Sequence, residues 1–320
     1  MLLNKLTFLL VFFTTLSLYA QPYIKPIKLY KADGSVTDIV YVKNRLYVAT
    51  SASSVNVFDK KTAKKVQTIT IAKIKNFMGK TINSKIYSVD VLHNNILILS
   101  QANHGFRQID IFANNTLTPA LPSSKKLYIA KAKFLDDENI LYALLSNDIV
   151  SYNFKTQTIN WSLQASQSKF SDFALNENKT KVALVDESGD VHIFDTKNGK
   201  LLKTLSGENL DNVFDVAFKN NIIATAGQDR RVVVYDLKHN TAYYKKSNFI
   251  IYSAGVSPSG EIIAYASDEN NNVTLFKRVS KLPLGTYTDI KMTPVQILFI
   301  DEKNFFVASD DNTVNLYKVK

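Results

Sequence analysis

Four aspartates and one glutamine recur at comparable positions on β-type segments, and carboxylates repeated in this way could hold a cation or a lysine of a partner. The residues are Asp38, Asp90, Asp172, Asp215 and Gln296. Carboxylate oxygens bind hard cations and accept charge-assisted hydrogen bonds from ammonium groups. Two interpretations stay open: a water-filled space that tolerates carboxylates, or a docking point for a cation or for a basic group of a partner.

Cysteine and histidine, the residue types most used in nucleophilic catalysis and transition-metal binding, are scarce. The chain has no Cys and only four His. This composition removes thiol nucleophiles, disulfides and Cys-based zinc or iron–sulfur sites. We expect His192 to lie on a strand beside a hydrogen-bonding neighbour and His104 to lie in a solvated loop. The sequence therefore predicts no catalytic, cofactor-binding or metal-binding residue.

Clusters of acidic residues at 136–139, 186–190, 268–272 and 310–313 look superficially like calcium loops. None has the ligand spacing of an EF-hand loop. They fall between predicted strands, where tight turns favour Asn, Asp and Gly. We interpret them as hairpin turns.

The elements that must position these residues form a repeat. A β-branched run that ends in an aromatic residue recurs along the chain, as in SVNVFD (54–59) and RVVVYD (231–236). The aromatics are Phe58, Phe112, Tyr152, Phe194, Tyr235, Phe276 and Tyr317. They are separated by 54, 40, 42, 41, 41 and 41 residues. A period of about 40 residues is the length of one four-stranded propeller blade, and we expect these aromatics to pack between blades.

The copies together predict an all-β, seven-bladed β-propeller over residues 36–320, within a single domain that spans 21–320. The last copy stops at its third strand, so we expect the stretch 22–30 to supply the missing strand and close the ring. The long first interval predicts an insertion around 71–84. The first strand of each blade lines the central channel, which would place the four aspartates and Gln296 in a partial acidic ring at its mouth.

The segment LKTLSGENLDNVFDVAFKNNIIATAGQDRRVVVYDL (202–237) resembles a WD40 repeat. Gly207-Glu208 stands at the Gly-His position of that pattern, Thr225 on the second strand, Asp229 on the following turn, and Tyr235-Asp236 at the Trp-Asp position. The resemblance implies a WD40-like propeller. Because the His and the Trp are replaced, we expect the side-chain hydrogen-bond network of the family to be incomplete.

The first twenty residues, MLLNKLTFLLVFFTTLSLYA, have the pattern of a secretory signal peptide. Lys5 precedes an apolar run, and Ala20 marks the expected cleavage site. The alternative is an uncleaved membrane anchor, for which the apolar run is short. We expect export to the periplasm and no membrane span after cleavage.

The formal net charge of +11 comes from 39 Lys and Arg against 28 Asp and Glu, and only five of the cations are Arg. Nucleic-acid recognition favours the arginine fork, so with the export signal we expect no nucleic-acid partner. The charge suits solubility and attraction to acidic partners or membrane surfaces. We expect a monomer.

Two classes of function are open. The first is a non-catalytic periplasmic scaffold that binds another exported protein and carries no cofactor. A Lys- and Asn-rich, Cys-free, exported propeller of this length resembles the accessory proteins encoded with the periplasmic nitrate reductase of epsilonproteobacteria, which implies a supporting role in assembly or electron transfer beside a respiratory enzyme or redox protein. The second class is a metal-dependent hydrolase or lactonase that uses the carboxylates at the central channel.

Overall fold

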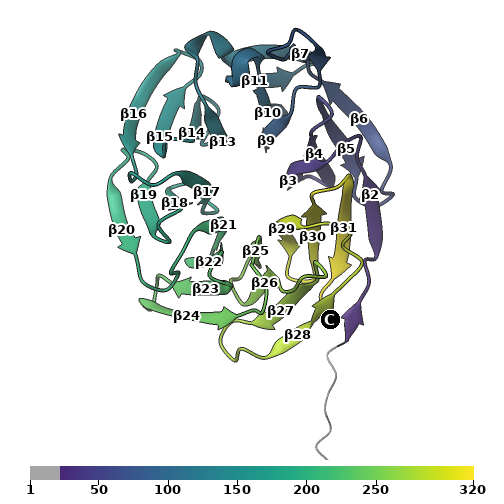
Figure 1. Cartoon of the computed structure of the whole chain (residues 1–320), viewed down its shortest axis with the longest axis vertical. Coiled ribbons are helices and arrows are strands. Elements are labelled where there is room, and N and C mark those ends of the chain that lie inside the picture. The colour runs from purple at the N-terminus through teal and green to yellow at the C-terminus, as the bar shows by residue number, and fades with distance from the viewer. Residues whose placement is uncertain (1–21) are drawn as a thin grey trace, which may run out of the picture.

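The computed structural model describes residues 22–320, and it forms seven sheets arranged as blades around a central opening (Figure 1). This arrangement confirms the predicted all-β, seven-bladed propeller. The innermost strands, one for each of blades 1 to 7, are β3 (Val36–Val42), β9 (Ile86–Leu92), β13 (Ile129–Phe134), β17 (Phe170–Leu175), β21 (Val213–Lys219), β25 (Ala254–Val256) and β29 (Pro294–Asp301). The predicted signal peptide, 1–20, lies outside the described residues.

Each innermost strand is followed by two middle strands, paired antiparallel in chain order. The second strands are β4 (Arg45–Thr50), β10 (Asn95–Gln101), β14 (Asn139–Leu144), β18 (Lys181–Asp186), β22 (Ile222–Gly227), β26 (Ile262–Ala266) and β30 (Asn304–Ser309). The third strands are β5 (Ser54–Asp59), β11 (Arg107–Ala113), β15 (Asp148–Asn153), β19 (Val191–Asp195), β23 (Arg231–Asp236), β27 (Val273–Lys277) and β31 (Thr313–Lys318). The outer strands of blades 1 to 6 are β6 (Lys65–Thr70), β12 (Thr116–Leu121), β16 (Thr158–Gln164), β20 (Leu201–Leu205), β24 (Thr241–Lys246) and β28 (Pro283–Tyr287).

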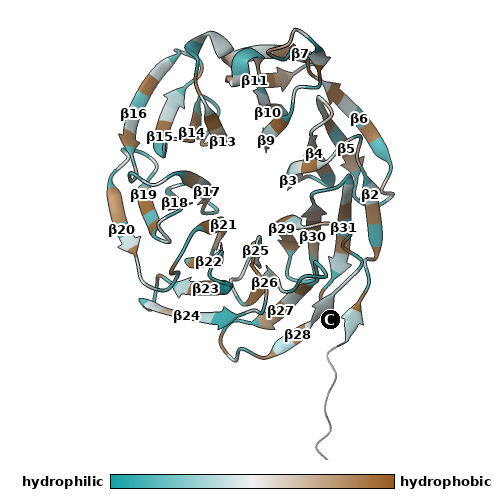
Figure 2. Cartoon of the chain, in the orientation of Figure 1, coloured by the Kyte–Doolittle hydropathy of each residue, from teal (hydrophilic) through white to brown (hydrophobic). Residues whose placement is uncertain are grey.

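Burial explains why the middle strands read as continuous apolar runs. A blade is covered on both faces by its neighbours, so β22 is buried at every position, and the β-branched and small residues of IIATAG suit such a strand. Outer strands have little cover, and β6 is exposed at all but one position. Figure 2 shows the same contrast, because β6 and β16 alternate hydrophilic and hydrophobic segments along the rim.

The hydrophobic core is divided among the junctions between blades. In the described residues, seven clusters of buried side chains each join two neighbouring blades. In one of them Tyr235 of blade 5 packs with Val185 of blade 4. Six of the seven repeat aromatics are buried, and Phe112 is half-buried. The period of the repeat therefore reflects the spacing of these junctions.

The N-terminal segment closes the ring, as the sequence predicts. Strand β2 (Lys28–Lys31) pairs antiparallel with β31 and becomes the outer strand of blade 7. The chain thus joins its two ends in one sheet, which Figure 1 shows as a purple strand beside a yellow one. Tyr30 is fully buried there, and its ring meets Phe58 of blade 1 and Phe306 of blade 7 edge to face.

A second strand in this segment differs from the prediction of one continuous strand. β1 (Tyr23–Ile24) pairs parallel with β28 and adds a fifth strand to blade 6. Pro26, which has no amide hydrogen, separates β1 from β2. Gly285 makes room for the added strand, because a Cβ at this position would lie 2.7 Å from the Ile24 side chain. The N-terminal segment therefore joins blades 6 and 7 as well as closing the ring.

The connection between blades 1 and 2 holds a small hairpin of its own. Its strands are β7 (Ile74–Lys75) and β8 (Thr81–Ile82). Single 3₁₀ turns occur at Asn103–Gly105 and Ser123–Lys125. No helix among residues 22–320 is long and apolar enough to cross a membrane.

Replacing Tyr30 with Ala should destabilise the propeller by about 3–5 kcal/mol, because it opens a cavity where the two ends of the chain meet. Urea unfolding, followed by circular dichroism, measures the free energy of unfolding. Leu29→Ala is the matched control, since Leu29 lies on the same strand with a side chain about half exposed. A similar loss in both variants would show that the closure does not depend on the Tyr30 packing.

Candidate functional site

One position on the innermost strands forms a ring around the channel. In every blade it lies opposite an apolar residue near the end of the second strand, and in six blades a β-bulge precedes it. We call these seven residues the channel ring: Asp38, Ser88, Lys131, Asp172, Asp215, Ser253 and Gln296. Three of the four predicted aspartates and Gln296 belong to it.

Asp90 is a correction to the prediction that all four aspartates occupy equivalent positions. Ser88 pairs with Leu99 and takes the ring position in blade 2, while Asp90 lies two residues further and pairs with Leu97. Asp90 is the third residue before the turn that begins at His93, whereas Asp38 is the fifth before the turn that begins at Lys43. A bulge adds one residue to one strand, and the bulge before Ser88 has counterparts before the ring residues of five other blades, so it does not displace Asp90.

The carboxylates of the channel ring bind the next blade. Asp38 Oδ2 of blade 1 accepts hydrogen bonds from the Val89 amide at 2.9 Å and from Ser88 Oγ at 3.0 Å in blade 2. Asp215 Oδ2 of blade 5 repeats this pattern with the Ala254 amide and Ser253 Oγ of blade 6, both at 2.9 Å. These aspartates thus join the backbones of adjacent innermost strands.

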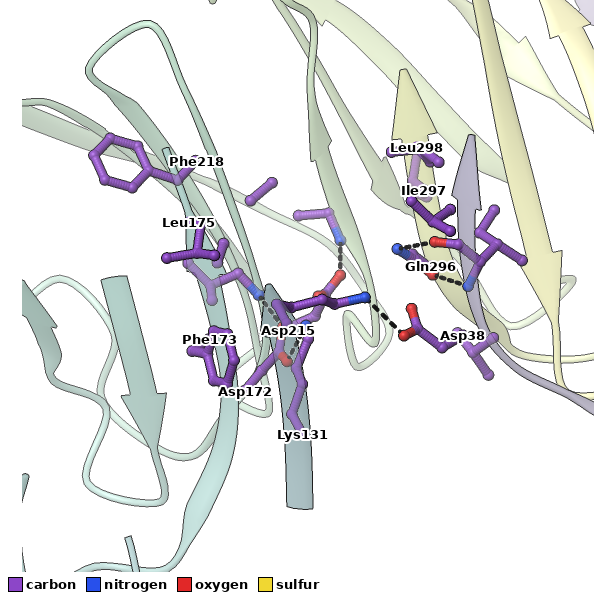
Figure 3. Close-up of a pocket in the computed structure, with 18 of the residues that line it drawn as sticks. Asp38, Lys131, Asp172, Phe173, Leu175, Asp215, Phe218, Gln296, Ile297 and Leu298 are labelled. Atoms are coloured by element: carbon purple, nitrogen blue, oxygen red, sulfur yellow. Dashed lines mark hydrogen bonds and ion pairs between the residues drawn. The ribbon is translucent and has the colours of Figure 1, made fainter. Parts of the chain in front are cut away.

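Other ring members make the same kind of link with different chemistry. Gln296 of blade 7 accepts from the Ile39 amide at 2.8 Å and donates to the Ile39 carbonyl at 3.2 Å. Lys131 of blade 3 donates to Asp172 of blade 4 at 2.6 Å, and Asp172 accepts the Val216 amide of blade 5 at 3.3 Å. Figure 3 shows Gln296 against the backbone of the neighbouring strand and Lys131 beside Asp172.

The ring is mixed in charge rather than acidic. Lys133, two residues after Lys131, donates to Asp38 Oδ2 at 2.8 Å and to the Val89 carbonyl at 2.7 Å. Asp90 accepts the Phe134 amide at 2.8 Å. The cavity that these side chains line has a volume of about 440 Å³.

The sequence analysis did not predict Lys131 and Lys133 as channel residues, because it considered only carboxylates and Gln296 at the repeated position. The sequence IAKAKF places both on the first strand of the third copy, where alternation sends them to the same face as the aspartates of other copies. That alternation was the available signal. The alternation places the two lysines on the channel side. It does not identify their partners, because the Asp38 that Lys133 bonds lies two blades away.

Electrostatics differ among the buried groups. Burial raises the pKa of Asp215 to about 7, the neighbouring Asp172 carboxylate adds to the rise, and Lys131 opposes it. Burial alone would lower the pKa of Lys131, but Asp172 and Asp38 outweigh that effect and raise it. Lys131 is therefore charged, with a direct bond to Asp172 and a longer-range attraction to Asp38.

The hydrogen bonds of the channel ring favour a structural role, the linking of blades, over metal binding or hydrolysis. Among residues 22–320, no three His, Asp or Glu side chains converge in a way that could hold a metal ion. The carboxylates that a hydrolase or lactonase would use accept backbone amides and two lysines, and a cation would have to displace these donors. We find no observation that favours the metal-dependent alternative.

The WD40-like residues of blade 5 form a reduced network. Asn209, the residue after Glu208, provides the side chain that bonds the second strand, since its Oδ1 accepts from Thr225 Oγ1 at 2.7 Å. Asp229, at the turn between β22 and β23, accepts the amides of Leu210 at 2.8 Å and Arg231 at 3.0 Å. These bonds fix the loop between blades 4 and 5.

A second buried network joins blades 3 and 4. The Asp186 carboxylate accepts from Asn147 at 2.9 Å, from Ser166 at 2.6 Å and from Ser188. Burial raises its pKa, but His192, whose Nε2 lies 3.6 Å away, and the bonds from Ser166 and Ser188 lower it more, so the pKa lies well below the usual range. His192 also meets Thr204 at 3.3 Å. His104 lies in the 3₁₀ turn at 103–105 and is exposed.

Taken together, the closed ring and its linked innermost strands define a seven-bladed β-propeller. Residues 199–236 match the family model described as WD domain, G-beta repeat. The match covers the fourth strand of blade 4 and the first three strands of blade 5, and with the seven blades it supports a WD40-like propeller. No curated protein matches the chain.

Replacing Asp38 with Ala should destabilise the protein by about 3 kcal/mol, because Lys133 and the Val89 amide would lose their buried acceptor. Chemical unfolding at neutral pH provides the measurement. Asp137→Ala is the control, since Asp137 pairs with His93 on the surface and such pairs contribute roughly 0–1 kcal/mol. Equal effects would contradict the role of Asp38 as a link between blades.

Asp215 should make stability depend on pH. Its native pKa lies above the unfolded value of about 3.9, so the native state binds the proton more tightly and stability falls as pH rises from about 4 through 7. Asp215→Asn removes this fall. We expect the free energy of unfolding of the variant, relative to the parent, to be higher at pH 8 than at pH 5 by on the order of 2 kcal/mol. Parallel pH profiles would contradict the raised pKa.

Proposed function

We propose that this propeller is a non-catalytic scaffold that binds another exported protein on one face of the ring. That face, which we call the loop face, carries the connections between blades and the turns between second and third strands. The supporting observation is that its exposed lysines gather on one side and leave most of its exposed acids on the other. Lysines gather over blades 1 to 3, at 73, 75, 80, 85, 125 and 126. Over blades 4 to 7, which we call the acidic half, the exposed acids are Glu187, Asp211, Glu269 and Asp310. Three exposed cations, Lys169, Arg230 and Lys291, stand among them, and Lys169 pairs with Glu187 at 3.2 Å.

The acidic half is the partner-binding surface in this proposal. Leu210, 65% exposed, stands beside Asp211 and adds an apolar contact to the charged ones. Residues of this kind steer a basic partner and fix its orientation. The channel ring has a different role here, because its carboxylates already bind neighbouring blades. Partner binding by Asp38, Asp90, Asp172, Asp215 and Gln296 stays a prediction.

The compartment and the partner in this proposal rest on features of the sequence. The first twenty residues support export, and the resemblance to accessory propellers of periplasmic nitrate reductase supports a respiratory enzyme or redox protein as the partner. In this proposal the chain assists assembly or electron transfer and does not reduce nitrate itself. The rigid ring would hold the partner in one orientation.

A charge reversal on the loop face tests the scaffold. Glu187→Lys, Asp211→Lys and Glu269→Lys combined should weaken binding of the partner at least roughly tenfold, since each removes one attraction and adds one repulsion. Asp137→Lys with Glu138→Lys, on the opposite face, is the matched control. Asp172→Asn with Asp215→Asn tests the channel: a loss confined to that variant would move the binding site to the ring.

The identity of the partner needs its own measurement. Tagged protein is purified from the periplasm of cells grown with and without nitrate, and affinity for each recovered respiratory component is then measured with purified proteins. We expect a component of the nitrate reductase system to bind directly. Absence of any such component would overturn the nitrate role and leave the scaffold proposal to the charge-reversal experiment.

A further inference from the structure

The hairpin between blades 1 and 2 presents two large apolar side chains to solvent. Phe77 is 95% exposed and Met78 is 76% exposed, and they are adjacent at the tip. Single exposed apolar residues are common on proteins. A neighbouring pair at the end of a projecting hairpin is a different arrangement, because both side chains can enter an apolar phase together.

The tip is held in a defined shape. Asn76 Oδ1 accepts the amides of Met78 and Lys80, both at 3.0 Å, and the Asn76 amide donates to the Lys80 carbonyl at 3.0 Å. Gly79 adopts a left-handed backbone conformation, with φ at 77°, which Gly accepts without strain. Little ordering is therefore needed when Phe77 and Met78 become buried.

Basic residues surround the tip. The hairpin segment 71–85 contains Lys73, Lys75, Lys80 and Lys85 and no acidic residue. The Lys75 amide donates to Asn103 Oδ1 at 3.1 Å, which ties the hairpin to the 103–105 turn. Figure 1 accordingly shows β7 at the rim beside β11.

The same surface continues onto the connection between blades 2 and 3. The segment 122–128 adds two exposed lysines and Tyr128, 49% exposed, whose ring packs on Phe106 at 5.3 Å. The Arg107 amide bonds the Leu127 carbonyl at 3.0 Å and connects this segment to the 103–106 loop. A basic surface with a Phe–Met tip and a Tyr at its border matches an anionic bilayer, where lysines meet phosphate groups and aromatics enter the interface.

We propose that the β7–β8 hairpin docks the propeller on an anionic phospholipid membrane, with Phe77 and Met78 inserted and the surrounding lysines on the headgroups. A bilayer fits better than a protein groove because the apolar contact is small and projecting while the basic surface around it is broad and carries no carboxylate. The proposal is independent of the partner, which binds the acidic half of the loop face. The two can therefore fail separately.

Vesicle sedimentation tests the proposal with the chain from Gln21 onward, which contains the whole propeller. Vesicles of phosphatidylglycerol and phosphatidylcholine in equal parts are compared with vesicles of phosphatidylcholine alone. We expect binding to the anionic vesicles at 0.1 M salt that weakens as the salt concentration rises. Equal binding to both compositions, or no binding to either, would overturn the proposal.

Matched variants assign the binding to the hairpin. Phe77→Ser with Met78→Ser should weaken vesicle binding at least roughly tenfold. Val279→Ser with Leu282→Ser is the control, since this pair is similarly exposed at a turn on the opposite face. Lys73→Gln, Lys75→Gln and Lys80→Gln should lower affinity by about fivefold per lysine, and Lys197→Gln, Lys200→Gln and Lys238→Gln should have little effect.

Three results would refute the assignment. Equal losses from the two lysine triples would indicate unspecific attraction to charge. Unchanged vesicle binding in the Phe77 and Met78 variant would remove the hairpin from the contact. Loss of partner binding in that variant, with vesicle binding intact, would make the tip a protein contact instead.

Discussion

The structure depends on the pairing of β2 with β31, because a propeller is stable only when its first and last blades meet. A blade has two apolar faces, and each needs a neighbour to cover it. Without β2, blade 7 would lack its outer strand and the buried Tyr30 ring that meets both Phe58 and Phe306. One short antiparallel pair, Lys28–Lys31 on the last strand, thus completes the burial on which the other six junctions rely.

The channel ring also joins neighbouring blades, at the centre of the propeller. The innermost strands diverge less than the outer strands, so a short Asp or Gln side chain reaches the backbone of the next blade there. Asp38, Asp215 and Gln296 each bond an amide of the neighbouring strand. Where blade 3 has Lys131 at that position, the acceptor is supplied by Asp172 of blade 4. The residue type at the ring position varies between Asp, Gln and Lys, but each of these side chains bonds the next blade.

The period of the sequence predicted the blades because each aromatic occupies a repeated place in the packing. Finer features depend on pairing that no single segment contains. Asp90 was aligned with Asp38, yet Ser88 holds the ring position and Asp90 lies two residues beyond it. The bond of Lys133 to Asp38 joins residues 95 apart in sequence. The two-residue strand β1 has too few residues for a pattern, and its parallel pairing with β28 follows from the path of the chain after ring closure.

A rigid ring converts separate surface features into a fixed geometry. Because the blades are linked at the centre and at the closure, the basic half and the acidic half of the loop face keep their separation and relative orientation. A membrane contact at the β7–β8 hairpin would then hold Glu187, Asp211 and Glu269 on the other side of the same face at a set distance from the lipid. A partner that works at the membrane surface would be presented at one height and in one orientation, which a flexible linker between two binding sites would not provide.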